Sequence, residues 1–179
     1  EKRILSVDLA LMASTKNKND ASAIFINQLL PTKAGRYTNN LVYTESSEGA
    51  HTADQALRVR KLYEMYMCDY IVIDVKGVGF GVADSLVRDI NDPDTGEVYP
   101  ALSCCNNAEW AARAPHGAEK ALWVINATDK FNSECAILLR DGFRAGRVRL
   151  LVSEYDGETS LAGIRGYGSL DTSDKLQLQ

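Results

Sequence analysis

The sequence predicts one α/β domain in which a mixed β-sheet is flanked by helices. Apolar runs of strand length at residues 4–10, 23–27 and 41–44 lie close together in the chain. From Thr52 the apolar spacing becomes helical, and a second dense apolar run follows at residues 70–75. An antiparallel meander, a crossover helix and a parallel strand account for this order.

Composition supports a single globular domain. The chain has 179 residues, of which 45% are hydrophobic and 25% charged, which excludes a disordered or fibrous protein. No apolar run approaches the roughly 18 residues that a membrane span needs. Because the chain does not begin with Met, we expect it to be a piece of a longer protein, all of it one domain.

Charge and cysteine content narrow the class further. A net charge of −4 excludes a generally basic nucleic-acid coat, although a local basic groove stays possible. The four cysteines form no C-x-x-C pair, so we expect reduced thiols in a cytoplasmic protein rather than disulfides or a zinc site. They are Cys68, Cys104, Cys105 and Cys135.

The first helix and the strand after it have clear local signals. Thr52 with Gln55 three residues later predicts a capping box, and apolar side chains then recur at helical spacing until about Cys68. Residues 70–75 are rich in β-branched side chains and predict a buried strand. Three glycines follow, and helical spacing resumes at Val82, which indicates a strand, a glycine turn and a helix.

The second half of the chain predicts two more strands and one more helix. Residues 98–103 are expected to form a fifth strand, parallel to the fourth, and residues 148–152 another one. Between them Thr128 is expected to cap a helix, which Gly142 or Gly146 would end. The side chains predicted to be buried by this helix are Phe131, Cys135 and Leu138 or Leu139.

Asp8 and Asp74 are the residues most suggestive of chemistry, because each stands near the end of a densely apolar strand. If these strands are parallel neighbours, the two carboxylates converge roughly 5 Å apart. Such a pair favours a divalent cation with oxygen ligands, Mg²⁺ or Mn²⁺, which can activate water for phosphodiester hydrolysis. The alternative is that each aspartate only caps the turn that follows it.

The glycine turn at residues 77–81 is a second signal, since glycines let a backbone approach a ligand and the following helix start attracts anions. Its spacing fits neither of the common phosphate-binding motifs, so a tight turn is the simpler interpretation. Lys76, two residues after Asp74, could meet a phosphate.

Several short motifs are spread over about residues 3–152. They are SVDLA at 6–10, Asn19-Asp20, YIVID at 70–74, GVG at 77–79, VADSL at 82–86 and GFRAGRVRL at 142–150. In these motifs the chain resembles the nuclease domain of large terminase subunits from tailed bacteriophages. The resemblance implies an RNase H-like fold and two-metal cleavage of concatemeric double-stranded DNA during genome packaging, in the cytoplasm of the host cell. It also implies an ATPase motor domain, a small terminase subunit and a portal or procapsid as partners.

By position in that family, Asp8 and Asp74 would be metal ligands and catalytic residues. The family has a third acid, which we expect beyond Gln179, with Asp171 and Asp174 as weaker alternatives. Asp20 and Asp84 are interpreted as a turn residue and a helix-start residue. Several cations could contact DNA phosphates, and we select Lys76, Arg144 and Arg147.

Two other functions stay open at this stage. A Holliday-junction resolvase or RNase H-type nuclease would share the acidic edge. A non-catalytic module of the same fold that binds a nucleotide or a partner would use the glycine turn instead. Substitution of Asp8 would then have no nuclease activity to remove.

Overall fold

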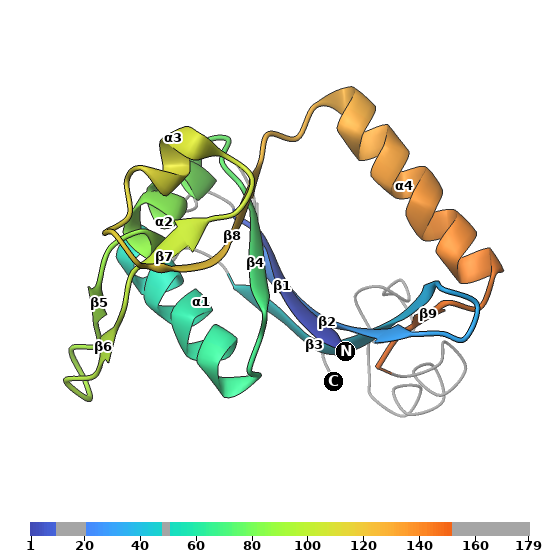
Figure 1. The fold of residues 1–179 in the computed structure, drawn as a ribbon, viewed down its shortest axis with the longest axis horizontal. Coiled ribbons are helices and arrows are strands. Elements are labelled where there is room, and N and C mark those ends of the chain that lie inside the picture. Colours follow the sequence, from blue (N-terminus) through green and yellow to red (C-terminus); the bar gives the residue numbers. More distant parts are fainter. Residues whose placement is uncertain (10–20, 48–50, 152–179) are drawn as a thin grey trace, which may run out of the picture.

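The computed structural model describes residues 1–9, 21–47 and 51–151. Its main feature is a seven-stranded mixed sheet with the strand order β7-β8-β4-β1-β2-β3-β9 (Figure 1). The strands are β1 (Lys2–Asp8), β2 (Ser22–Pro31), β3 (Tyr37–Ser47), β4 (Tyr70–Asp74), β7 (Leu102–Cys104), β8 (Glu119–Ile125) and β9 (Val148–Arg149). The predicted RNase H-like α/β class, with a β1-β2-β3 meander and β4 parallel to β1, is confirmed.

Four neighbouring strands of this sheet run parallel. β1 pairs with β4, β4 with β8, and β8 with β7, all in the parallel sense. Parallel neighbours end at the same edge of a sheet, so the carboxyl ends of these four strands share one edge. We call it the carboxyl edge.

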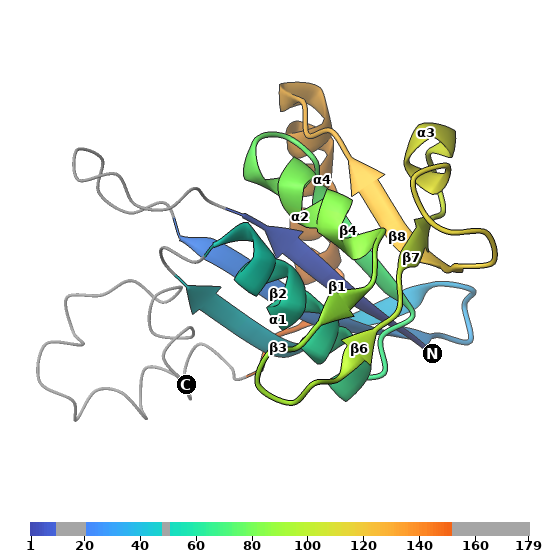
Figure 2. The same cartoon turned by 90° about the vertical axis from the view of Figure 1, so that its left-hand side faces the viewer.

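One face of the sheet is covered by α1 (Thr52–Met65) and α2 (Val78–Leu86), and α3 (Ala108–Ala111) lies beside them over β7 (Figure 2). Strand residues that alternate along β1 and β4 join the apolar side chains of α1 and α2 in one core. Its fully buried members include Leu5, Ile71, Val59, Leu62, Val82 and Leu86.

The start of α1 differs from the prediction. The residue before the helix is His51, and its side chain makes no capping hydrogen bond. Gln55 instead lies buried, with its side-chain amide donating to the Ser22 hydroxyl of β2 over 3.2 Å. The capping box is therefore wrong, because tertiary contact with the sheet takes the side chain that would have closed it.

The predicted fifth strand at residues 98–103 is also wrong in its extent and in its neighbour. It divides into β6 (Val98–Tyr99), which forms a small hairpin with β5 (Ile90–Asn91), and β7 in the main sheet. The second neighbour of β4, on the side away from β1, is β8, which the sequence analysis does not predict. Leu122 and Val124 of β8 are buried, whereas Trp123 between them is 41% exposed, and this short alternation is typical of a strand.

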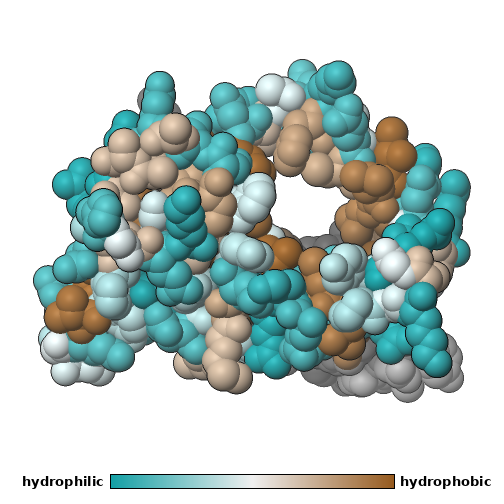
Figure 3. All heavy atoms as spheres, in the orientation of Figure 1, coloured by the Kyte–Doolittle hydropathy of each residue, from teal (hydrophilic) through white to brown (hydrophobic). Residues whose placement is uncertain are grey.

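The last helix, α4 (Asp129–Arg144), begins as predicted, with the Thr128 hydroxyl accepting a hydrogen bond from the Phe131 amide over 3.2 Å. Gly146, with φ +63°, follows its end. The predicted burial of its apolar side chains is wrong, because Cys135 is exposed and Leu138 and Leu139 are 70% and 51% exposed. The helix spans the second face of the sheet at a distance, and Figure 3 shows an opening between them with hydrophobic residues along part of its rim.

Two further observations concern the state of the cysteines and the length of the helices. All four cysteines are free thiols, as predicted. Among the described residues, no helix combines the length and the apolar character that crossing a membrane requires.

Candidate metal site at the carboxyl edge

The two aspartates selected from the sequence lie on neighbouring strands that end together. β1 and β4 are parallel, with Val7 opposite Ile73 as the last registered pair. The next residues along the two strands are Asp8 and Asp74, the final residues of β1 and β4. Neighbouring strands are about 4.8 Å apart, so both carboxylates emerge side by side at the carboxyl edge.

Both side chains belong to the face that α4 spans. Val7 and Ile73 are buried on the side of α1 and α2. Successive side chains alternate between the faces of a sheet, so Asp8 and Asp74 project from the other face. Asp8 is exposed and Asp74 is half-buried.

Asp74 is oriented by backbone groups from two segments. Its Oδ1 accepts hydrogen bonds from the amide of Lys76 over 3.1 Å and from the amide of Ala127 over 3.3 Å. The Lys76 ammonium group donates to the carbonyl oxygen of Ala127, which closes this small network. The segment between β8 and α4 therefore fixes one oxygen of the Asp74 carboxylate.

The glycine turn brings the start of α2 against the end of β4. A Cβ at position 79 would lie 1.7 Å from the carbonyl oxygen of Asp74, so only glycine allows this approach. Gly77, with φ +59°, is the residue before α2 and adopts a backbone conformation that favours glycine. Both glycines thus serve the tight strand-to-helix turn that the sequence analysis considered as the simpler interpretation.

The donor set fits a hard divalent cation. Mg²⁺ and Mn²⁺ take carboxylate oxygens together with water and phosphate oxygens, and two adjacent carboxylates at an accessible edge supply the protein part of that shell. The hydrogen bonds to Asp74 hold Oδ1 in place, which orients the whole carboxylate for coordination. The residues present therefore fit the predicted ion.

A third acidic ligand is not found in the part of the chain that the structure describes, where no group of three or more His, Cys, Asp or Glu side chains could hold a metal ion. Asp20, Asp171 and Asp174 lie outside the described residues. Asp84 is not at a helix start, because α2 begins at Val78. Its carboxylate pairs instead with Arg88 and Arg113, each over 3.0 Å.

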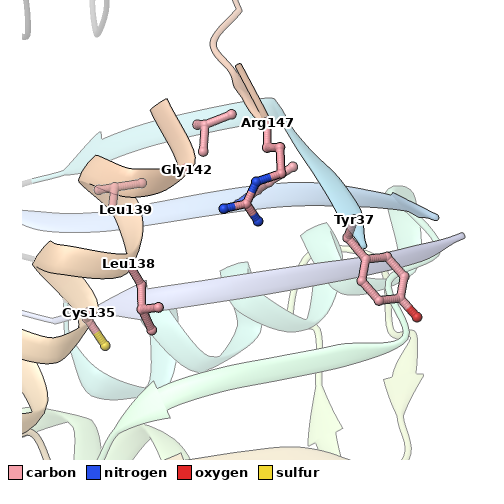
Figure 4. Close-up of a pocket in the computed structure, with 8 residues that line it drawn as sticks. Tyr37, Cys135, Leu138, Leu139, Gly142 and Arg147 are labelled. Atoms are coloured by element: carbon pink, nitrogen blue, oxygen red, sulfur yellow. The ribbon is translucent and has the colours of Figure 1, made fainter. Parts of the chain in front are cut away.

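The three predicted DNA contacts lie at two ends of the molecule. Lys76 is at the carboxyl edge, where its ammonium group is engaged by the Ala127 carbonyl oxygen. Arg144 ends α4, and Arg147 lies just before β9, far from the end of β4 along α4 (Figure 1). Arg147 lines a cavity of about 310 Å³ with Tyr37 and side chains of α4, and Figure 4 shows its guanidinium group directed into that space.

The role of Ala127 was missed because a backbone donor leaves no mark on residue type. The available signal was indirect, namely the apolar run at residues 121–125 that forms β8. Recognising that run as a strand parallel to β4 would have placed the following residues beside Asp74. No protein-family model matches this chain, and no curated protein is significantly similar to it.

Proposed function

We propose that this chain is a metal-dependent DNA endonuclease that acts at the carboxyl edge. The observation that carries the proposal is the parallel register of β1 and β4, which makes Asp8 and Asp74 the next adjacent pair. Two carboxylates this close repel one another unless a cation or a proton lies between them. The exposure of Asp8 leaves the pair accessible to a large substrate such as DNA.

In this proposal Asp8 and Asp74 hold the ion, and the amides of Lys76 and Ala127 keep the Asp74 carboxylate oriented. A bound Mg²⁺ or Mn²⁺ supplies an activated water and charge stabilisation for phosphodiester hydrolysis. The likeness to terminase nuclease domains supports the narrower proposal that the substrate is concatemeric viral double-stranded DNA. An ATPase motor domain, a small subunit and a portal or procapsid are then its partners.

The test is nicking of supercoiled plasmid in Mg²⁺ and in Mn²⁺, with Asp8→Asn and Asp74→Asn beside the unmodified chain. We expect metal-dependent nicking that both substitutions reduce to background. Asp141→Asn is the matched control, since Asp141 is a half-exposed aspartate near the end of α4, and it should cut normally. Calorimetric titration with Mn²⁺ on the same proteins measures the metal site without any cleavage.

Each result has a distinct meaning. Cutting that survives both substitutions would refute the assignment of the site. Mn²⁺ binding that needs Asp8 and Asp74, without any cutting by this chain or by a form extended beyond Gln179, would retain the metal site but refute the endonuclease. Nicking of plasmid DNA without preference for branched or hybrid substrates would indicate the terminase-like activity. Selective cutting of branched DNA would indicate a resolvase, and selective cutting of RNA–DNA hybrids would indicate an RNase H-type nuclease.

A further inference from the structure

A cluster of aromatic and cationic side chains lies at the same edge of the sheet as the proposed metal site, on the face that α1 and α2 cover. Residues from distant parts of the sequence form it. α2 follows β4 and α3 follows β7, so both helices begin at the carboxyl edge that carries Asp8 and Asp74. Figures 1 and 2 show α2 and α3 next to each other over this end of the sheet. The close approach of Gly79 to the Asp74 carbonyl oxygen brings the first turn of α2 against the end of β4.

Three side chains, those of Phe80, Trp110 and Arg113, pack together in this cluster. The rings of Phe80 and Trp110 meet edge to face, with centroids 5.1 Å apart and an interplanar angle of 63°. The guanidinium group of Arg113 lies 4.7 Å from the Trp110 ring centre and 5.2 Å from that of Phe80. Trp110 is buried at 7% exposure, whereas Phe80 is 45% exposed and the Arg113 side chain is 42% exposed.

Two side chains of the cluster are more exposed than packing alone requires. Trp110 anchors α3 against the core, yet Phe80 and Arg113 remain open to solvent beyond it. The Asp84 carboxylate pairs with the guanidinium groups of both Arg88 and Arg113. This ion pairing orients Arg113.

An exposed aromatic ring next to an oriented guanidinium group suits a nucleic-acid strand. Bases and sugars stack on aromatic faces without sequence preference, and arginine meets phosphate oxygens through several donors. We propose that Phe80 and Arg113 form a contact surface for a DNA strand at the carboxyl edge, which also carries the carboxylate pair. Its location next to the cutting site rests on the proposed function, but the binding itself does not.

The experiment is a fluorescence-anisotropy titration of a labelled single-stranded oligonucleotide in EDTA, where no metal-dependent cutting occurs. We expect Phe80→Ala to weaken binding by about 5- to 10-fold, since loss of one stacking contact removes part of the affinity. We expect Arg113→Gln to weaken it about 3- to 10-fold and to reduce the salt slope by about 0.7. Arg36→Gln, at an exposed turn between β2 and β3, is the control and should bind within about twofold of the unmodified chain.

Folding is checked separately for each variant by thermal unfolding. Phe80→Leu keeps apolar contact with Trp110 but has no aromatic face, so it should also weaken binding even where Phe80→Ala unfolds. Binding by Phe80→Leu and Arg113→Gln that equals the Arg36→Gln control overturns the proposal, and so does an unmodified chain that binds no DNA.

A duplex of the same sequence separates single-strand stacking from phosphate contact. Weaker binding of both nucleic acids by Arg113→Gln, with a larger effect of Phe80→Leu on the single strand, is the expected pattern. If the surface variants lose binding but no form of the protein cuts DNA, the contact surface stands and the endonuclease fails.

Discussion

The two faces of the central sheet are packed very differently. On the first face, Leu62 of α1 and Leu86 of α2 are 1% and 0% exposed, in a continuous core with β1 and β4. On the second face, Leu138 and Leu139 of α4 are 70% and 51% exposed. Leucines at helical spacing are thus buried in α1 and α2 but exposed in α4.

The difference shows that helical spacing of apolar residues predicts which face of a helix is apolar, but not whether the sheet covers that face. α4 meets the sheet near its finish, where Gly142 lies against the Val148 side chain of β9, whereas the Thr128 cap at its start is a bond within the helix. The proposed metal site also projects from this second face. The first face of the sheet therefore contributes most of the buried apolar packing, and the Asp8 and Asp74 side chains project from the second face.

The largest expected effect comes from equal substitutions in the two layers. Leu62→Ala removes a buried side chain and should lower the free energy of unfolding by about 3 kcal/mol. Leu138→Ala removes an exposed one and should change it by less than about 0.5 kcal/mol. Urea denaturation followed by circular dichroism measures both. Comparable losses would mean that α4 packs on the sheet in solution.

A second pair of substitutions compares the glycines that allow close approach. Gly79→Ala would place a Cβ 1.7 Å from a backbone oxygen that cannot move freely, and should cost about 1–3 kcal/mol. Gly142→Ala would place one 2.9 Å from a methyl group of the Val148 side chain, which can rotate away. Helix propensity favours alanine by up to about 1 kcal/mol, so Gly142→Ala should be nearly neutral. Denaturant midpoints of the two variants test this contrast.

These contrasts also explain which parts of the structure the sequence could predict. The meander, α1, β4, α2 and the adjacency of Asp8 and Asp74 followed from apolar periodicity and the short connections. Periodicity reports local burial, which is enough to find these elements. The pairing of β1 with β4 joins residues 66 positions apart and was a supposition of the sequence analysis, which the register confirms. The short strand β8 was missed because its apolar run is brief and follows an irregular segment containing Pro115.

The parts that could not be predicted depend on contacts between distant residues. The amide of Ala127 reaches Asp74 across 53 positions of the chain, and no residue type encodes that donor. Phe80, Trp110 and Arg113 meet only because α2 and α3 follow strands that end at the same edge. The exposure of the α4 face had no signature at all, since its spacing matches that of a buried helix.

A third prediction concerns the hairpin that packs on α1. The Lys61 ammonium group lies 2.7 Å from the buried Asp92 carboxylate and lowers its pKa to about 2, helped by the Asp94 amide and the Thr95 hydroxyl. A carboxyl with a lowered folded-state pKa stabilises the fold above its ordinary value of 3.8, and this contribution is lost as pH falls towards about 2. The thermal unfolding midpoint of the unmodified chain should therefore fall more steeply over that pH range than the midpoint of Asp92→Asn. Parallel pH profiles would show that this ion pair does not contribute.

The smallest expected effect is at the start of α4, and it tests whether that helix unfolds together with the core. Thr128→Ala removes the hydroxyl that accepts from the Phe131 amide, a loss of about 1 kcal/mol in helix stability. Because the apolar face of α4 is exposed, the loss should stay local. We expect faster hydrogen exchange of the α4 amides and an unchanged midpoint for unfolding of the core.

Asn107→Ala is the matched comparison for Thr128→Ala. The Asn107 side chain likewise accepts from a helix amide, that of Trp110, but α3 is joined to the core through that buried ring. Loss of this cap should therefore lower the global midpoint as well as the protection of α3. If Thr128→Ala also lowers the global midpoint, then α4 unfolds together with the sheet. In that case the two faces of the sheet belong to one cooperative unit, and the exposure of the α4 leucines no longer marks a separate layer.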